Sequence, residues 1–423
     1  MDAKRLSRFK DSYGVNCLFL GIFPALFYFA AVTILIVKNN FHSFWIGLRN
    51  IFDFTPGQVS DFLVIGGLEA SLINAALIGS LNVLVIWQSR CPVDGKVIAA
   101  FFTVLGFSFV GKTIFNIIPI YLGGWIYWHK NKVKIQGTLP VMMFATSLAP
   151  VVSWLYRHQE LSAMTGSFMA LVVGMALGYL VVPVARRLHF FHKGHSLYHI
   201  GFCTGLLATA VARLGRIFNL GISPERNVSL ANSGELFLLF GVIVFILLSS
   251  CLLLKKRGIR DLGLESGGIG SFEPEGGPGS IVLNMAIMAV LSLGYVRLVG
   301  GILCGPVVAG IFTLIGFGAC GKNLSNCLPV MAGAIGGIIF LDLPMNDPGL
   351  IAAVLFATTL APMVTNYGRI AGVVAGFCHL FMIGDTILLH GGLCLYNNGF
   401  TGGLVAGTLV SLFERIKYKK SSC

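Results

Sequence analysis

Apolar runs of roughly 20 residues recur along almost the whole chain, and short polar segments separate them. Each run is long enough to cross about 30 Å of hydrocarbon as an α-helix. Up to the middle of the chain, the predicted crossings are 15–37, 62–87, 138–156, 162–185, 196–213 and 235–254. Because these runs leave no soluble domain of ordinary size, the pattern predicts an all-α polytopic membrane protein in contact with the lipid bilayer.

The charged residues support this class. Of the 423 residues, 56% are hydrophobic and only 11% are charged, whereas a soluble globular protein carries about 25% charged residues. The net charge is +13, but the basic residues cluster at the ends of apolar runs, as in cytoplasmic loops. We therefore expect no nucleic-acid partner, and a protein of the plasma membrane with both termini in the cytoplasm.

A glycine-lysine segment occurs twice, 210 positions apart. Residues 101–120 and 311–330 agree at eight of twenty positions, where chance gives roughly two. The identical pairs are Phe102/Phe312, Thr103/Thr313, Gly106/Gly316, Phe107/Phe317, Gly111/Gly321, Lys112/Lys322, Asn116/Asn326 and Pro119/Pro329. Two more blocks return in the same order, 144–150 as 356–362 and 194–208 as 392–406. The chain is therefore a tandem duplication.

The charges also orient the two copies. The segment at about 97–128 is too long for one crossing, and basic residues place both of its ends inside. We therefore expect a re-entrant hairpin that is broken at Gly111 and Pro119. An odd number of crossings precedes the second copy, so that copy is inverted, with its hairpin at about 305–340. The prediction is two inverted repeats of about five crossings each, with one re-entrant or broken-helix hairpin per repeat.

The domain boundaries follow from this plan. The first repeat covers 1–254, with the alternative that the span 235–254 already begins the second repeat. A glycine-rich stretch, 255–280, is predicted to be a cytoplasmic linker between the halves. The remainder of the second repeat covers 281–423.

Residues Gly106 to Thr113 match the phosphate-loop pattern GxxxxGK[ST]. Such a loop joins a strand to a helix in water-accessible protein. Here it lies in an apolar run, and the second copy has Asn323 in place of the Ser/Thr. The ten cysteines form no CxxC pairs, and no HExxH or Gly-x-Ser-x-Gly motif is present. We expect no enzyme activity, no metal and no cofactor.

The two lysines are the leading candidates for function. A lysine inside a membrane is expensive and is seldom kept without a partner or a task. Lys112 and Lys322 either meet a solute between the halves, or pair with a carbonyl or carboxylate and hold their hairpins in place. Asn116 and Asn326 lie four residues further on, and they share the face of each lysine if the second arm is helical.

Other candidates occur in equivalent pairs. Thr146 and Thr358 precede prolines by four residues, which predicts two half-broken spans whose freed carbonyls bind solute or simply mark a kink. The Tyr-x-x-Gly-Phe blocks are rich in small residues, as tight helix packing requires. In the alternative, Tyr198, Tyr396 and Asn398 line a pathway.

Two acidic residues are candidates for a counter-ion or proton carrier. Asp385 belongs to the second copy alone, and its other interpretation is an interfacial pairing with His390. Glu69 is in the segment before the first hairpin, so it is a candidate partner of Lys112.

The five-plus-five inverted plan, with a re-entrant segment after the second crossing, resembles the urea transporters. The block Tyr396-Asn397-Asn398-Gly399 is similar to their tyrosine-asparagine-glycine block, although it lies in the last crossing here, and their leucine-proline-phenylalanine motif is absent. By its overall composition the chain resembles an uncharacterised bacterial family of multi-pass membrane proteins, which implies no known substrate. The resemblance implies architecture and no site residues.

The sequence predicts a membrane permease, either a transporter or a channel, for a small polar solute, with an anion as one option. The pathway is expected at the interface of the inverted halves, and a homo-oligomer remains open. Two alternatives are an intramembrane enzyme or lipid-handling protein that holds a phosphate headgroup through the paired lysines, and a structural membrane subunit.

Overall fold

The computed structural model describes residues 3–54, 59–222, 226–228, 234–254 and 278–421. The first half contains α1 (Ala3–Lys38), α2 (Phe41–Asp53), α3 (Phe62–Ile65), α4 (Gly67–Ser89), α5 (Gly95–Phe107), α6 (Ile114–Asn131), α7 (Ile135–Ala145), the 3-10 turn η1 (Thr146–Leu148), α8 (Ala149–Tyr156), α9 (Ala163–His192) and α10 (His199–Ile217). The helix α11 (Gly234–Leu253) follows. The second half then contains α12 (Pro278–Leu298), α13 (Gly305–Gly318), α14 (Leu324–Phe340), α15 (Pro348–Ala357), η3 (Thr358–Leu360), α16 (Ala361–Tyr367), α17 (Arg369–His390) and α18 (Asn397–Ser421). Two-residue strands, β1 (Val59–Ser60) and β2 (Arg226–Asn227), pair in parallel.

Nine helical stretches in the described residues are long and apolar enough to cross a membrane. The stretch Ile135–Tyr156 combines α7, η1 and α8, and Pro348–Tyr367 combines α15, η3 and α16. The predicted fold class, an all-α polytopic membrane protein, is confirmed. Most of the predicted linker, residues 255–277, lies outside the described residues.

Each glycine-lysine segment forms two short helices with a non-helical break between them. The breaks fall between α5 and α6 and between α13 and α14. Gly111 (φ +80°) and Gly321 (φ +95°) adopt left-handed backbone there, which residues with a Cβ rarely do. The predicted break at Pro119 is wrong, because α6 continues through this proline. Its ring fits against Gly174, where an added Cβ would lie 2.7 Å from the Pro119 Cβ.

The predicted half-broken spans are confirmed. Thr146 and Thr358 each begin a 3-10 turn that interrupts a crossing. Pro150 and Pro362 stand in the first turn of the helix that follows, where a missing N–H removes no helical hydrogen bond. The interruption therefore lies at the threonines, and the prolines permit the helix to start again.

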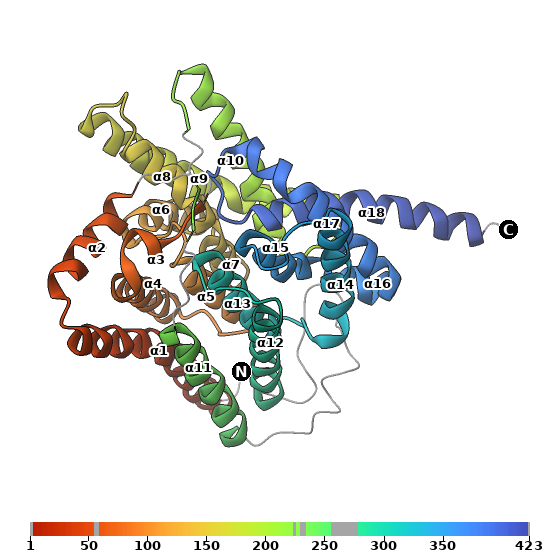
Figure 1. The fold of residues 1–423 in the computed structure, drawn as a ribbon, viewed down its shortest axis with the longest axis horizontal. Helices are drawn as coiled ribbons and strands as arrows, with labels where there is room; N and C mark the ends of the chain where they lie inside the picture. Colours follow the sequence, from red (N-terminus) through yellow and green to blue (C-terminus); the bar gives the residue numbers. More distant parts are fainter. Residues whose placement is uncertain (1–2, 55–58, 223–225, 229–233, 255–277, 422–423) are drawn as a thin grey trace.

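Helices α5 and α13 pack against each other at the centre of the molecule (Figure 1). Gly95 at the start of α5 lies against Ala319, just after α13, while Gly305 at the start of α13 lies against Phe109, just after α5. These reciprocal contacts show that the two equivalent helices run antiparallel. When a surface of one repeat packs against the same surface of the other repeat, the two repeats are related by two-fold symmetry.

The surrounding helices repeat the same arrangement. In the first half, α1 packs on α4 and α6 packs on α9. In the same way, α11 packs on α12 and α14 packs on α17. Helices α10 and α18, one from each half, pack together beside the centre. Gly201 and Gly399 meet there, and a Cβ on either would lie about 3.0 Å from the other's Cα. The two halves therefore share one interface that is built from equivalent elements.

Substitution of a central glycine should separate α5 from α13. A Cβ on Gly106 would lie 2.7 Å from the Cβ of Phe312, so Gly106→Ala is expected to lower stability by about 1–3 kcal/mol. The matched control is Gly241→Ala on α11, where a Cβ meets nothing within 4 Å. This control should be neutral or stabilising by about 0.5–1 kcal/mol. Thermal unfolding in detergent micelles measures both, and equal stability of the two variants would contradict the central packing.

Candidate functional site

Lys112 and Lys322 are fully buried at the hairpin breaks, and each connects the two halves. The Lys112 Nζ donates to the Thr146 Oγ1 of its own half at 2.7 Å and to the Tyr396 hydroxyl of the other half at 2.7 Å. Lys322 repeats this arrangement, donating to Thr358 Oγ1 at 2.7 Å and to the Tyr198 hydroxyl. The lysine, threonine and tyrosine of the predicted site are therefore brought together, with the tyrosine always from the opposite half.

Aromatic rings complete the surroundings of each lysine. The Lys112 Nζ lies 4.6 Å from the centroid of the Tyr396 ring, and the Lys322 Nζ lies 4.2 Å from that of Tyr198. Phe107 and Phe317 stand next to them at 5.7 and 5.1 Å from the respective Nζ atoms. Such rings attract a cation through their π faces. Within the described residues, neither lysine forms an ion pair. The partners of each Nζ atom are therefore hydroxyl groups and aromatic rings.

Two asparagines that the sequence analysis missed hold the breaks in shape. The Asn74 side-chain amide donates to the carbonyls of Ser108 and Lys112, both at 2.8 Å. Asn284 donates to the carbonyls of Gly318 and Lys322 at 2.7 and 2.6 Å. These carbonyls have left the helix and would otherwise be unsatisfied in an apolar setting. The signal was present in the sequence, because the two asparagines have the same 210-residue spacing as the lysines.

Asn116 and Asn326 take part in capping the helices that follow the two breaks, and neither lines the pocket described below. Each is the third residue of its helix, and its side chain accepts from the backbone N–H of the N-cap residue, Thr113 or Asn323, in a capping box. The remaining amide hydrogens of Asn116 donate to the Gly111 carbonyl and to Ser153. A side chain with its donors and acceptor so occupied serves to start the helix.

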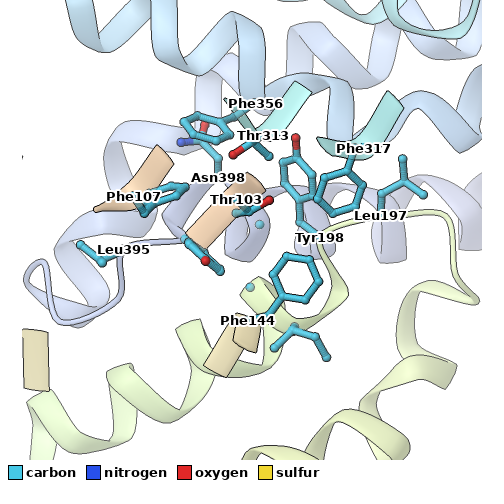
Figure 2. Close-up of a pocket in the computed structure, with 14 residues that line it drawn as sticks. Thr103, Phe107, Phe144, Leu197, Tyr198, Thr313, Phe317, Phe356, Leu395 and Asn398 are labelled. Atoms are coloured by element: carbon cyan, nitrogen blue, oxygen red, sulfur yellow. The ribbon is translucent and has the colours of Figure 1, made fainter. Parts of the chain in front are cut away.

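A pocket of about 40 Å³ lies between the halves, and Figure 2 shows the 14 residues that line it. Its lining consists of seven equivalent pairs, each with one member from either half. They are Thr103/Thr313, Phe107/Phe317, Phe144/Phe356, Leu197/Leu395, Tyr198/Tyr396, Ile200/Asn398 and Gly201/Gly399. The pocket therefore lies on the pseudo-two-fold axis, and its volume suits a few water molecules or one very small solute.

The pocket and the lysines form two successive layers. Tyr198, Tyr396 and Asn398, which were predicted to line a pathway, do line the pocket. Lys112 and Lys322, with Thr146 and Thr358, bond the tyrosine hydroxyls and are not among the lining residues. The lysines therefore contact the lining of the pocket through the tyrosine hydroxyls.

The two acidic candidates lie apart from this layer. Glu69 does not pair with Lys112, contrary to expectation: its carboxylate lies 3.6 Å from Lys38, which also pairs with Glu235 at 3.0 Å. Lys38 is in the last turn of α1, and the two carboxylates are in the first turns of α4 and α11. Asp385 is exposed on α17, and His390 bonds the Asn397 side chain at 3.0 Å instead.

A second cavity, of about 300 Å³, lies in the first half of the chain and next to the pocket. It lies among α7, α9 and α10, and its lining includes Arg186, His189 and His199. Arg186 and His189 are exposed, so the cavity is a groove that reaches the molecular surface. Ile200 lines both the groove and the central pocket and therefore contacts both cavities.

Comparison with known proteins gives a family and no function. No curated protein and no solved structure matches the chain. A family model described as "Protein of unknown function (DUF1576)" matches residues 40–217 and 267–415, which include both lysines, both tyrosines and all seven pairs of the pocket. Since the match covers well over half of the sequence, the chain belongs to this family of unknown function.

Proposed function

We propose that the protein is a permease for a small polar solute, with its pathway between two inverted halves. The observation that carries this proposal is the pocket of seven equivalent pairs on the pseudo-two-fold axis. A site that is symmetric between two halves suits movement from either side of a membrane, whereas catalysis normally needs an asymmetric group of residues. The antiparallel α5 and α13 support inversion of one half relative to the other. The basic clusters at the ends of the apolar runs favour a plasma-membrane protein with both termini in the cytoplasm.

The count of crossings supports the same orientation. If α11 opens the second half, as its packing on α12 suggests, five span-length stretches of the described residues precede it. An odd number reverses the direction of the second copy. The broken spans and hairpins then place non-helical backbone at membrane depth, where it is tolerated when buried in protein or next to a wet cavity.

The side chains divide into a contact layer and a support layer. Rings of Phe107, Phe144, Phe317 and Phe356 and of the two tyrosines would contact the solute. Each lysine would hold one tyrosine at a fixed angle and add positive potential behind the ring. Since every lysine bonds a tyrosine of the opposite half, sliding of one half against the other breaks or remakes these bonds. The lysines would thereby couple the shape of the pocket to the arrangement of the halves.

The groove on the first half would be one mouth of the pathway, with Ile200 as the barrier. The test is uptake of radiolabelled acetamide, ethylene glycol and acetate by proteoliposomes that contain the full chain. We expect uptake above protein-free liposomes for at least one solute, faster uptake with Ile200→Ala, and background uptake with Ile200→Trp. Leu214→Ala, at an exposed position of the same helix, is the matched control and should behave as wild type. Background uptake for every solute and variant would refute the permease proposal.

A further inference from the structure

The pocket departs from the duplication at a single pair. Six of the seven pairs contain the same residue in both halves, whereas the seventh pairs Ile200 with Asn398. Both residues lie two positions after a lining tyrosine, Tyr198 or Tyr396. Asn398 therefore makes one wall of the pocket polar where the equivalent wall is apolar, and Figure 2 shows it among the aromatic rings.

The Asn398 side-chain oxygen has no hydrogen-bond partner among the described residues, although it is buried. A buried acceptor without a partner is destabilising, so its retention needs a reason. The threonine hydroxyls in the wall bond elsewhere: Thr103 Oγ1 donates to the Ala99 carbonyl and Thr313 Oγ1 to the Ala309 carbonyl, both at 2.7 Å. The two tyrosine hydroxyls bond the lysines. A hydrogen-bond donor for the Asn398 oxygen can therefore come from a molecule that enters the pocket.

The rest of the lining restricts the chemistry of that group. Four phenylalanine rings face the pocket, and none of its lining residues is charged. A carboxylate entering this pocket would lose its hydration and would meet an acceptor oxygen. A neutral N–H or O–H group would instead satisfy Asn398, with its apolar remainder against the rings.

We infer that Asn398 is the specificity-determining residue of the pathway. It accepts a hydrogen bond from the N–H or O–H group of a neutral solute small enough for the pocket. The transport part of this statement rests on the proposed function, whereas the binding part is tested independently of uptake.

The test uses three probes with equal numbers of non-hydrogen atoms: acetamide, which donates; dimethyl sulfoxide, which only accepts; and acetate, which is an anion. Their binding to the full chain in lipid nanodiscs is measured by saturation-transfer NMR. We expect acetamide to bind about tenfold more tightly than the other two. Asn398→Leu should remove this preference. Ile200→Asn, which places a second amide on the opposite wall, should increase it and provides a test if Asn398→Leu does not fold.

Several outcomes would overturn the inference: no binding, equal binding of the three probes, tighter binding of acetate, or an unchanged preference in the folded Asn398 and Ile200 variants. Tighter binding of acetate would mean that the amide presents its N–H groups to an anion. Uptake separates the two proposals. Binding that depends on Asn398 without uptake refutes the permease and the transport part of the inference, and leaves the binding part standing. Uptake with no such dependence refutes the inference alone.

Discussion

Lys112→Met and Lys322→Met, separately or together, should reduce solute uptake to the level of protein-free liposomes. Methionine keeps an unbranched side chain of similar length but cannot donate a hydrogen bond. The Tyr396 or Tyr198 ring then loses the group that bonds its hydroxyl, and the positive potential behind the pocket disappears. Uptake by reconstituted proteoliposomes, normalised to the amount of incorporated protein, measures the effect.

The same variants should remain folded. Methionine removes the buried donor and its charge, and it leaves the tyrosine and threonine hydroxyls with each other as partners. We therefore expect a loss of stability of at most about 1–3 kcal/mol. Lys134→Met is the matched control, because Lys134 is exposed at the N-cap of α7 and lies outside the site. Unfolding of both site variants would show that the lysines serve only to hold the hairpins, and wild-type uptake would remove them from the pathway.

Removal of the tyrosine hydroxyl should cost more stability than removal of the lysine. Tyr396→Phe leaves the Lys112 Nζ buried with one acceptor fewer, at an expected cost of about 2–4 kcal/mol. The double variant, Lys112→Met with Tyr396→Phe, no longer contains the unsatisfied donor. It should therefore recover most of the stability lost in Tyr396→Phe.

Thermal or denaturant unfolding of the two single variants and the double variant forms a double-mutant cycle. The equivalent cycle on Lys322 and Tyr198 should give the same sign, because the contacts of the two halves are reciprocal. Tyr295→Phe on α12 is the control, since its buried hydroxyl has no recorded partner in the described residues and its loss should be neutral or stabilising. Additive effects in both cycles would contradict the proposed coupling between the halves.

Much of the architecture could be predicted because the duplication supplies each signal twice. A single Gly-Lys-Thr resembles a phosphate loop, but Gly111 and Gly321 in two apolar segments indicate two breaks, and both adopt positive φ. The half-broken spans were found in the same way, from Thr146 and Thr358 at equivalent positions. Equal spacing also marks Asn74 and Asn284, whose contacts to the break carbonyls went unrecognised.

The contacts that could not be predicted join residues on different helices, and a single sequence does not show which helices pack together. Proximity along the chain suggested Glu69 as a partner of Lys112, yet the nearest base is Lys38 on a neighbouring helix. Pro119 looked like a helix break, but the helix continues because Gly174 leaves room for the ring. The thirteen-residue helix α2 was missed because it is too short to cross a membrane. Which tyrosine meets which lysine follows only from the packing of the two halves.

The most direct test of the central claim fills the pocket itself. Thr103 and Thr313 line it from α5 and α13, and the double variant Thr103→Leu with Thr313→Leu adds apolar volume from both sides. Uptake of the transported solute by proteoliposomes is then compared with wild type, with folding verified by thermal unfolding. A pathway through the pocket predicts background uptake by a folded protein. Wild-type uptake by the folded double variant would contradict it.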